Sequence, residues 1–435
     1  MSDPLSSASR REFLQATSIT ALSGLMASAA SFGDDVETLK VAVVGCGSRG
    51  CELIRALTTI EGVSVVAVCD IYGPHLERGW QYAGPFASSF ANSAELLDES
   101  RPDAVVIATP LDTHFAIARA AVEQGCAVYC EKLMCYSLEQ ARQLAAACDE
   151  HQTVFQVGLQ MRANAVYRQA AAMVQTGLIG RIVGVECHWH RHTAWRRPVP
   201  VPRDSPEFLK WDRELNWWLY PDRSHGLLAE FGSHQFDLVQ WILGVAPQRV
   251  NALGGLSLYD DGRKTPDHVV CLVEYELTPP VVRKGSSRPT QESSTKPYTT
   301  CMTWSAWQGN AFSGAAEIFY GETGTLRLSP KKGELYREAS TDTVSWSPQA
   351  EGNASLVTAG KTLVDIIDPW TRKAQPIEIL PTGNETRDAL VAFVECVRTK
   401  NRDTLADVHA GLANTRTTLL AQKSLETRTW QEQTA

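Results

Sequence analysis

The stretch Leu39-Lys40-Val41-Ala42-Val43-Val44-Gly45-Cys46-Gly47-Ser48-Arg49-Gly50 decides the fold of this chain. Residues 39–44 form an apolar, β-branched run, as expected of a strand that is buried on both faces. The pattern G-x-G-x-x-G follows at once, and residues 52–59 then have helical character. A glycine turn between a strand and a helix is the context in which this pattern binds a dinucleotide. The stretch therefore predicts the start of a Rossmann fold.

The residues of the glycine turn have separate expected roles. Gly45 allows the tight turn, Gly47 lets a pyrophosphate approach the backbone, and Gly50 lets the helix pack closely on the strand. Ser48 and Arg49 open the helix, whose N-terminus favours phosphate charge, so both are expected to contact the cofactor. The alternative is a glycine turn that binds no nucleotide.

Asp70 is expected to select the nucleotide. It ends the second predicted strand, residues 63–69, about 20 residues beyond the turn. A carboxylate at this place accepts hydrogen bonds from the adenosine ribose 2′-hydroxyl and repels a 2′-phosphate. The sequence therefore favours NAD as the cofactor and makes NADP the second choice.

Alternating strands and helices continue to about residue 158. Strand-like runs lie at 104–108 and 127–130, and helical stretches lie at 114–124 and 137–150. This alternation predicts a parallel, doubly wound sheet, in which ligands bind beyond the carboxyl ends of the strands. The residues that follow two of these strands are therefore expected to contact the cofactor: Thr109, Pro110, His114, Glu131 and Lys132. Lys132 is then directed toward the nicotinamide, unless it is a plain surface lysine.

Beyond residue 158 the pattern changes. A predicted helix at 163–176 leads to a strand at 181–192, and residues 193–225 are irregular and rich in Pro, Trp and Arg. A helix is predicted at 227–243, and residues 248–380 are mostly strand-like. The predicted organisation is a Rossmann domain at 36–158, a substrate domain at 159–382, and C-terminal helices at 383–435 that pack back on both.

A second polar constellation spans residues 230–237, Glu-Phe-Gly-Ser-His-Gln-Phe-Asp. Glu230 and His234 are four residues apart, so on a helix they share one face, and Asp237 can lie on the same side. A carboxylate that holds an imidazole is a usual arrangement for a general base near neutral pH. The alternative is a structural histidine paired with Asp237, and the sequence leaves both open.

The order of these motifs resembles the glucose–fructose oxidoreductase, inositol dehydrogenase and MocA-type family over nearly the whole chain after residue 30. The similar pieces are residues 43–50, 108–114, 131–132, 232–237 and 321–326. The resemblance implies a second, α+β domain with a large open, mostly antiparallel sheet. It also implies a lysine beside the nicotinamide, a histidine that accepts a proton and an acid that binds substrate hydroxyls. These positions are Lys132, His234 and Glu230, and a homodimer or homotetramer is implied as well.

Two positions depart from the family pattern. Leu133 stands where a proline usually follows the lysine, and Glu230 stands where an aspartate is usual. Neither departure removes a functional group, but each predicts a local change in geometry.

The implied reaction is oxidation of a CH–OH group of a sugar, cyclitol or glycoside, with hydride transfer to a tightly held nicotinamide cofactor. Arg162, Trp217 and Trp218 are expected to contact this substrate together with Glu230 and His234. The tryptophans can equally anchor a long loop to the sheet. The alternative reaction is an NAD-dependent glycoside hydrolysis by transient oxidation and elimination. A protein that binds the nucleotide without catalysis is a third possibility.

The N-terminus is typical of an export signal. Arg10-Arg11-Glu12-Phe13-Leu14 precedes a mildly apolar stretch without acids, and Ala27-Ser28-Ala29 supplies small residues for cleavage. Residues 1–30 therefore predict a twin-arginine signal, which carries folded proteins to the periplasm. The alternative is an N-terminal helix that contains two arginines.

Composition excludes several other classes. The 435 residues carry a net charge of −8, and no basic face for nucleic acid is visible. After residue 30 no apolar run is long enough to cross a bilayer. The eleven cysteines are odd in number and include no C-x-x-C pair, so buried thiols are expected rather than disulfides or a zinc ribbon.

Three histidines alternate along the predicted strand at 181–192. His188, His190 and His192 therefore share one face, where they can bind zinc or form a polar surface near the substrate. No nearby carboxylate or thiolate completes a ligand set, so no metal is predicted.

Overall fold

The computed structural model describes residues 38–279, 296–337, 377–379 and 383–433. Leu39–Ala435 forms one compact unit, in which two sheets are built. The export signal predicted at residues 1–30 lies outside the described residues.

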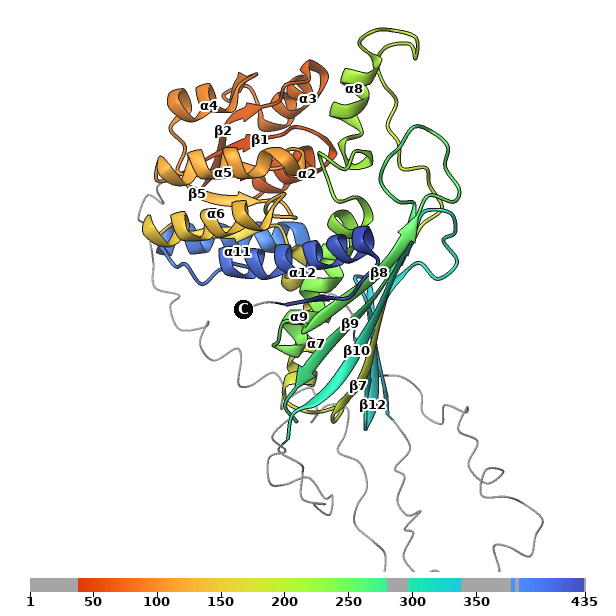
Figure 1. The fold of residues 1–435 in the computed structure, drawn as a ribbon. Helices are drawn as coiled ribbons and strands as arrows, with labels where there is room; N and C mark the ends of the chain where they lie inside the picture. Colours follow the sequence, from red (N-terminus) through yellow and green to blue (C-terminus); the bar gives the residue numbers. More distant parts are fainter. Residues whose placement is uncertain (1–37, 280–295, 338–376, 380–382, 434–435) are drawn as a thin grey trace, which may run out of the picture. The chain divides into compact units, whose positions relative to one another are not determined.

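The first sheet confirms the predicted Rossmann fold (Figure 1). Its six strands pair in parallel in the order β3-β2-β1-β4-β5-β6, which is the order typical of Rossmann folds. The strands are β1 (Leu39–Val44), β2 (Val63–Cys69), β3 (Ser88–Phe90), β4 (Ala104–Ile107), β5 (Ala127–Cys130) and β6 (Phe155–Val157). The helices are α2 (Ser48–Leu57), α3 (Gly73–Ala83), α4 (Ser93–Ser100), α5 (His114–Glu123) and α6 (Leu138–Glu150).

Burial explains the composition of this sheet. Every residue of β4 and β5 is buried, because helices cover both faces of a doubly wound sheet. Helix α2 begins at Ser48, directly after the glycine turn and earlier than the helical stretch expected from the sequence. The turn therefore joins β1 to α2 with no intervening loop, which places the helix N-terminus at the carboxyl end of the sheet.

The second sheet is large and mostly antiparallel, as expected. Its nine described strands follow the order β14-β13-β12-β11-β7-β10-β9-β8-β15, and only the β7–β10 pair is parallel. The strands are β7 (Ile182–His190), β8 (Arg249–Gly255), β9 (His268–Leu277), β10 (Tyr298–Trp307), β11 (Ala315–Gly321), β12 (Gly324–Ser329), β13 (Lys332–Arg337), β14 (Ile377–Ile379) and β15 (Gln431–Glu432).

The two faces of this sheet differ. Helices α7 (Ala165–Gln175) and α9 (Ser233–Leu243) cover one face and share its hydrophobic core (Figure 1). On the other face, Leu253, Val270 and Leu272 are exposed to 54%, 42% and 44%, respectively. Leu253 and Val270 are direct partners across β8 and β9, so these apolar side chains form one patch.

The C-terminal helices connect the two sheets. Helix α11 (Glu385–Thr399) packs on α2, whereas α12 (Val408–Thr427) contacts α6 on one side and α9 and β8 on the other. None of the described helices is long and apolar enough to span a bilayer. All eleven cysteine thiols are free, and nine of them are buried.

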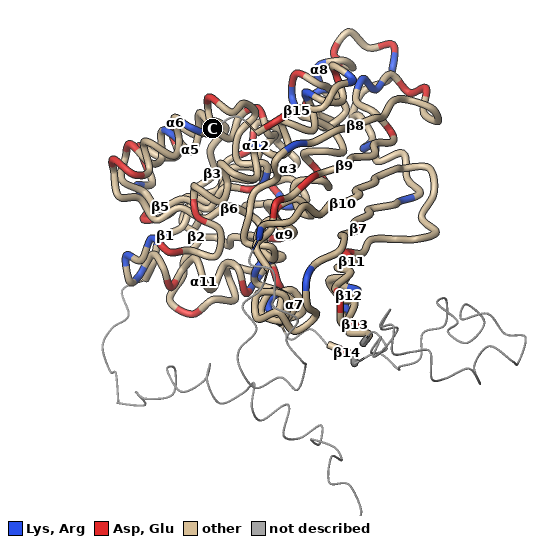
Figure 2. Tube along the Cα trace, turned by 60° about the horizontal axis from the view of Figure 1, so that its bottom comes forward, with Lys and Arg blue, Asp and Glu red and all other residues tan. Residues whose placement is uncertain are grey.

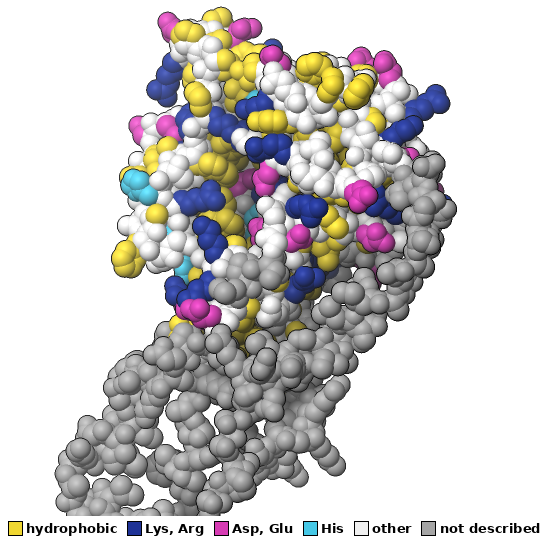
Figure 3. Space-filling view, turned by 180° about the vertical axis from the view of Figure 1, so that it is seen from behind, with side chains coloured by type: hydrophobic (Ala, Val, Ile, Leu, Met, Phe, Trp, Pro, Cys, Tyr) yellow, Lys and Arg dark blue, Asp and Glu magenta, His cyan; other side chains and the backbone are white. Residues whose placement is uncertain are grey.

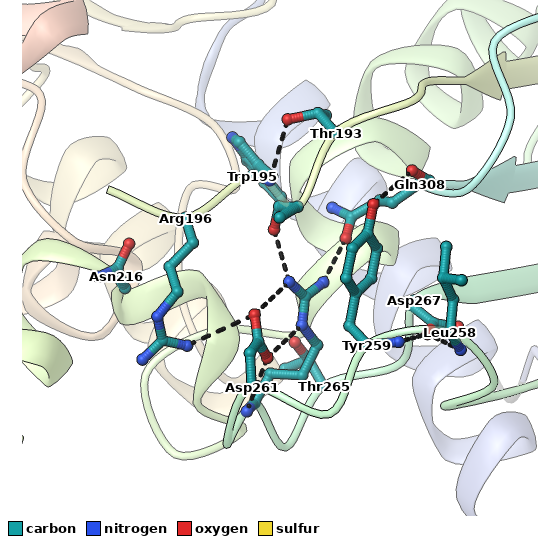
Figure 4. A network of polar contacts seen from close by, with 12 residues as sticks. Thr193, Trp195, Arg196, Asn216, Leu258, Tyr259, Asp261, Thr265, Asp267 and Gln308 are labelled. Atoms are coloured by element: carbon teal, nitrogen blue, oxygen red, sulfur yellow. Dashed lines mark hydrogen bonds and ion pairs between the residues drawn. The ribbon is translucent and has the colours of Figure 1, made fainter. Parts of the chain in front are cut away.

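Residues 191–226 form an excursion between β7 and α9 that we call the cover segment. It contains α8 (Phe208–Leu215) and a short 3-10 turn, Trp217–Leu219, although the sequence had suggested irregular structure throughout. A buried guanidinium anchors its beginning (Figure 4). Arg263 donates to Gln308 Oε1 at 2.6 Å, to the Ala194 carbonyl at 2.5 Å, and to both carboxylate oxygens of Asp261.

Candidate active site

A cleft of about 480 Å³ lies at the carboxyl ends of the Rossmann strands. Seven residues predicted to bind the cofactor line it from the Rossmann side: Gly45, Gly47, Ser48, Arg49, Asp70, Thr109 and Pro110. Arg197, Glu214, Trp217 and Arg223 of the cover segment line it from the opposite side. The Rossmann side and the cover segment therefore both contribute to the lining of the cleft.

The glycine turn has the shape that a pyrophosphate requires. Gly45 has φ of +94°, a left-handed conformation that favours glycine. A Cβ at Gly50 would lie 1.8 Å from the Gly45 carbonyl oxygen, whereas a Cβ at Gly47 would meet only the His75 ring, at 4.0 Å. The third glycine thus permits close packing, and the second leaves open space beside the N-terminus of α2. These residues fit a dinucleotide.

Asp70 is fixed at the end of β2 by the backbone. Its Oδ2 accepts a hydrogen bond from the Cys46 N–H at 2.7 Å, and its Oδ1 accepts one from the Tyr72 N–H at 2.8 Å. An ionised carboxylate has about four acceptor sites, so about two remain for ribose hydroxyls. This arrangement fits the ribose of NAD.

Two residues predicted to contact the cofactor hold the loops that form its site, and of the two only Arg49 also lines the cleft. Arg49 Nε donates to Glu131 Oε1 at 2.7 Å, which joins the glycine turn to the end of β5. His114 is only 1% exposed, and its two ring nitrogens each lie 2.9 Å from a carbonyl oxygen, of Thr109 and of Leu133. The prediction of direct cofactor contact is therefore wrong for His114, because its ring is sealed behind the loops.

Lys132 joins the two sheets. It follows β5, and its peptide bond to Leu133 is cis. Its Nζ donates to both Glu230 Oε2 and the Glu230 carbonyl oxygen at 3.1 Å. Ser224 Oγ donates to the other carboxylate oxygen at 3.2 Å. An ammonium has three N–H groups, so one remains to bind a substrate oxygen.

His234 lies in the first turn of α9 and is 8% exposed. The Trp189 ring stacks on it, with centroids 5.8 Å apart, and its Nδ1 is buried with no partner among the described residues. Burial, helped by the charges of Lys132, Arg49 and Arg191, holds the pKa of His234 well below its usual range. The imidazole is therefore neutral near pH 7 and able to accept a proton.

The expected carboxylate partner of His234 is not found. Asp237 instead accepts hydrogen bonds from Arg162 Nε at 2.9 Å and Arg162 Nη2 at 2.6 Å, and Glu230 is bound to Lys132. Arg162 also donates to the Leu405 carbonyl at 3.1 Å. The substrate role predicted for Arg162 is corrected, because these contacts make its guanidinium part of the scaffold behind α9.

A buried network fixes α9 on the second sheet. Gln235 Nε2 donates to Glu317 Oε1 at 2.6 Å, and Tyr167 OH donates to Glu317 Oε2 at 2.8 Å. Trp304 Nε1 donates to Gln235 Oε1 at 2.8 Å. Burial raises the pKa of Glu317 to about 7. The residue after His234 is thus locked, which limits the rotation of the helix that presents the imidazole.

For one of the aromatic residues near the site, Trp218, the structure favours the loop-anchoring alternative. Trp218 is 3% exposed and donates from Nε1 to the Trp195 carbonyl at 2.9 Å, so it anchors the cover segment and is not a free sugar platform. Trp217 lines the nucleotide cleft. Sequence reasoning missed Trp189 and Phe231, whose stacked rings lie 5.3 Å apart beside His234. The alternation of β7 was the available signal, because Trp189 lies on the face opposite His188 and His190.

The three alternating histidines bind main-chain or hydroxyl groups. His188 and His190 share one face, with ring centroids 4.9 Å apart. Their Nε2 atoms lie 3.2 Å from the Ser313 carbonyl and 2.9 Å from Ser305 Oγ, and His192 Nδ1 lies 2.9 Å from the Gly309 carbonyl. Within the described ranges, no three His, Cys, Asp or Glu side chains are placed to hold a metal ion.

Ion pairs fasten the cover segment across the nucleotide cleft. Arg223 pairs with Asp112 of the Rossmann side at 2.8 Å and with Glu214 at 2.8 Å. Tyr136 OH donates to the Pro221 carbonyl at 2.6 Å. Basic and acidic residues are interspersed along α8 and its flanking loops (Figure 2). The cover segment is therefore held on the Rossmann side by polar contacts.

Comparisons with known proteins agree with this architecture. Residues 39–159 match the family model "Oxidoreductase family, NAD-binding Rossmann fold", and residues 167–282 match "GFO/IDH/MocA C-terminal domain". A 2,7-anhydro-N-acetylneuraminate hydratase of Mediterraneibacter gnavus is 29% identical over 222 residues, which cover 51% of this chain and 53% of that protein. An inositol 2-dehydrogenase of Ralstonia nicotianae is 32% identical over 209 residues, 48% of this chain and 55% of that protein. The matches thus span about half the length of these curated relatives.

Solved structures resemble the chain over a greater length. An oxidoreductase domain protein from Kribbella flavida has a TM-score of 0.66 at 19% identity and covers 92% of this chain and 100% of its own. A levoglucosan dehydrogenase, solved with NADH and levoglucosan, has a TM-score of 0.64 at 15% identity, with 91% and 99% covered. At these identities the likeness shows a shared fold.

Proposed function

Because this chain belongs to the Gfo/Idh/MocA oxidoreductase family and contains its NAD-binding Rossmann domain, we propose that it oxidises a CH–OH group of a sugar, cyclitol or glycoside. NAD, held in the cleft beneath the cover segment, is the proposed hydride acceptor. One observation carries the proposal. An ammonium that follows β5 of the first sheet and an imidazole on α9, which packs on the second sheet, lie close enough for the charge of Lys132 to act on His234.

Each group has a distinct part in the proposed reaction. Neutral His234 accepts the proton of a substrate hydroxyl, and the free N–H of Lys132 stabilises the oxyanion that develops. Glu230 orients Lys132 and can also accept a hydrogen bond from a neighbouring substrate hydroxyl. The bound nicotinamide supplies the redox chemistry by taking up hydride from the same carbon. The cover segment lines the nucleotide cleft opposite the Rossmann side and so brings its own polar groups to this region.

The enzymes that resemble this chain support a carbohydrate-like substrate. They include inositol dehydrogenases and a dehydrogenase solved with levoglucosan. Inositol and levoglucosan are both polyhydroxylated rings. The proposed site has the polar groups that such rings need, with hydroxyl-binding carboxylate and ammonium groups beside an aromatic wall. The identity of the ring stays open within this class.

Mass spectrometry of the denatured, purified protein tests the cofactor. We expect released NAD or NADH, with little NADP. The protein is then incubated with a panel of sugars and cyclitols while absorbance at the NADH band is followed. Absence of nucleotide, together with no spectral change when NAD and the panel are added, would remove the proposed function.

A second candidate is a glycoside hydrolase that oxidises a sugar hydroxyl, eliminates the aglycone and reduces the ring again. The cover favours it, because a nucleotide enclosed by Arg197, Trp217 and Arg223 suits a cycle without cofactor exchange. A relative named as a hydratase indicates that non-redox outcomes occur among similar chains. Aryl glycosides separate the candidates. Release of the aryl alcohol without accumulation of NADH supports the hydrolase, and stoichiometric NADH supports the dehydrogenase.

We also propose that the protein is exported to the periplasm by the twin-arginine route. Arg10-Arg11 and the weakly apolar stretch after them support this, and a folded protein can carry NAD with it. Fusing residues 1–34 to a reporter and replacing both arginines by lysine tests the route. Export of the reporter should stop in the double-lysine variant.

A homodimer or homotetramer is proposed as the assembly. The supporting observation is the apolar patch of Leu253, Val270 and Leu272 on the uncovered sheet face, which suits a second copy of this chain. Light scattering after size-exclusion chromatography measures the mass. A charged substitution, Val270→Lys, should shift the assembly toward monomer.

A further inference from the structure

Arg191 lies beside the proposed proton acceptor. It directly follows β7, and its guanidinium lies over the Phe231 ring at 4.7 Å and over the Trp189 ring at 5.5 Å. Trp189 in turn stacks on His234, and Phe231 is the neighbour of Glu230 in the chain. The guanidinium and the imidazole therefore border one aromatic wall, formed by Trp189 and Phe231.

No described carboxylate forms an ion pair with Arg191, although nearby cations are paired. Lys132 binds Glu230, Arg49 binds Glu131, and Arg162 binds Asp237. Arg191 is half-buried, and burial lowers its pKa. A partly desolvated charge without a counter-ion is costly unless a partner arrives. The two rings supply only a cation–π contact, which leaves the N–H edge of the guanidinium unmatched.

The nucleotide does not account for this charge. Arg191 is not among the residues that line the nucleotide cleft, where Arg197 already provides a positive charge with no carboxylate partner among the described residues. The molecule as a whole is acidic, with a net charge of −8. On the face shown in Figure 3, however, Lys and Arg side chains flank a hollow with His and acidic side chains deeper inside. Basic side chains thus gather locally even though the chain as a whole is acidic.

We propose that Arg191 binds an oxyanion of the substrate, so that the preferred substrate is an acidic sugar. A planar guanidinium matches a carboxylate or a phosphate with two parallel hydrogen bonds. Its place along the wall from His234 puts the anion on the same ring as the reacting hydroxyl or on a neighbouring ring. This inference rests on the proposed function, because only that function makes the bound sugar a substrate. Its test measures binding and does not require turnover.

Binding to the purified holoprotein is measured by titration calorimetry with D-glucuronate, D-galacturonate, glucose 6-phosphate, D-glucose and D-galactose. The acids should bind more tightly than their neutral parents. Arg191→Gln should weaken binding of the acids about ten- to hundredfold, because charge-assisted hydrogen bonds are lost, and should change binding of the neutral sugars by less than twofold. Arg191→Lys keeps the charge without the fork and should give an intermediate loss.

Arg181→Gln is the matched control. Arg181 precedes β7 at its other end and also lies over an aromatic ring, that of Tyr298 at 4.3 Å, but it is exposed and remote from His234. Its loss should leave all five affinities unchanged. Nucleotide content and the melting temperature of each variant show whether the fold is intact.

The outcomes separate the two proposals. Tighter binding of glucose 6-phosphate than of both uronates identifies a phosphate as the anion, and the reverse identifies a carboxylate. Equal binding of acids and parents, or equal loss of both in Arg191→Gln, overturns the inference, even if neutral sugars are oxidised. Selective, Arg191-dependent binding of acids without any NADH formation keeps the inference and removes the dehydrogenase.

Discussion

The arginines behind the site and those in front of it differ in whether a carboxylate pairs with them. Behind the site, Arg49 and Arg162 each have a carboxylate partner, and their hydrogen bonds join distant parts of the chain. In front of the site, Arg191 lies over the Phe231 ring of the wall and Arg197 lies over the Trp218 ring at the nucleotide cleft, and neither forms an ion pair with a described residue. The difference separates cations that hold the fold from cations that are available to ligands.

The largest effect is expected at the reacting end of the wall. His234→Ala should reduce turnover by about 10²–10⁴-fold, the usual contribution of a general base. The nucleotide content of the purified protein should not change, because His234 does not line the nucleotide cleft. Turnover is measured with the best substrate of the panel. A variant as fast as the unmodified protein would show that another group takes the proton.

Breaking a scaffold pair should cost stability. Asp237→Ala leaves the Arg162 guanidinium buried without its partner, which typically costs about 3–5 kcal/mol of unfolding free energy. Arg191→Gln should change the same quantity by less than about 1 kcal/mol, because it leaves no carboxylate unpaired. Urea denaturation of both variants gives the comparison. Similar losses in the two would erase the distinction between scaffold and ligand-binding cations.

The glycine turn offers a smaller and more local effect. Gly50→Ala places a methyl group against the Gly45 carbonyl oxygen, so the turn must shift. Overpacking of this kind costs about 1–3 kcal/mol. If the nucleotide-bound conformation bears this cost, NAD affinity falls roughly five- to more than a hundredfold. Gly73→Ala is the control, since its Cβ would meet nothing within 4 Å. Fluorescence titration with NADH reports both affinities.

The smallest effect concerns pH. The pKa of His234 is held well below its usual range by burial and by neighbouring positive charges, so the imidazole stays neutral as pH falls through 6.5. With the ordinary value of about 6.5, half of the rate would be lost at that pH. We therefore expect kcat/KM at pH 6.5 to stay above half of its value at pH 8. A midpoint at or above pH 6.5 would contradict a desolvated base.

Local patterns made the Rossmann half predictable. The apolar run of β1, the glycine turn and the acid after β2 are all signals that lie within one short stretch. The segment from α3 to α4 was not predicted, because β3 consists of only Ser88-Ser89-Phe90 and has no apolar run. A short strand with mostly exposed residues has no apolar run or alternation from which it could be predicted.

Long-range pairings could not be predicted in the same way. Asp237 was expected near His234, but its partner is Arg162, 75 residues earlier in the chain. Such a pair depends on how α9 faces the rest of the molecule, which the spacing of residues 230–237 does not determine. Arg191 and Trp189 were within reach of sequence reasoning. The alternation that places His188 and His190 on one face of β7 also places Trp189 and Arg191 on the opposite face.

The cover segment has a kinetic consequence. The same thirty-odd residues carry Arg191 beside the aromatic wall and Arg197, Trp217 and Arg223 at the nucleotide cleft, so a movement of this segment that frees one ligand would disturb the contacts of the other. We therefore expect exchange of the bound nucleotide with the surroundings to be slow. Slow exchange favours a reaction in which the bound nucleotide returns the hydride to the substrate carbon before either ligand leaves the site.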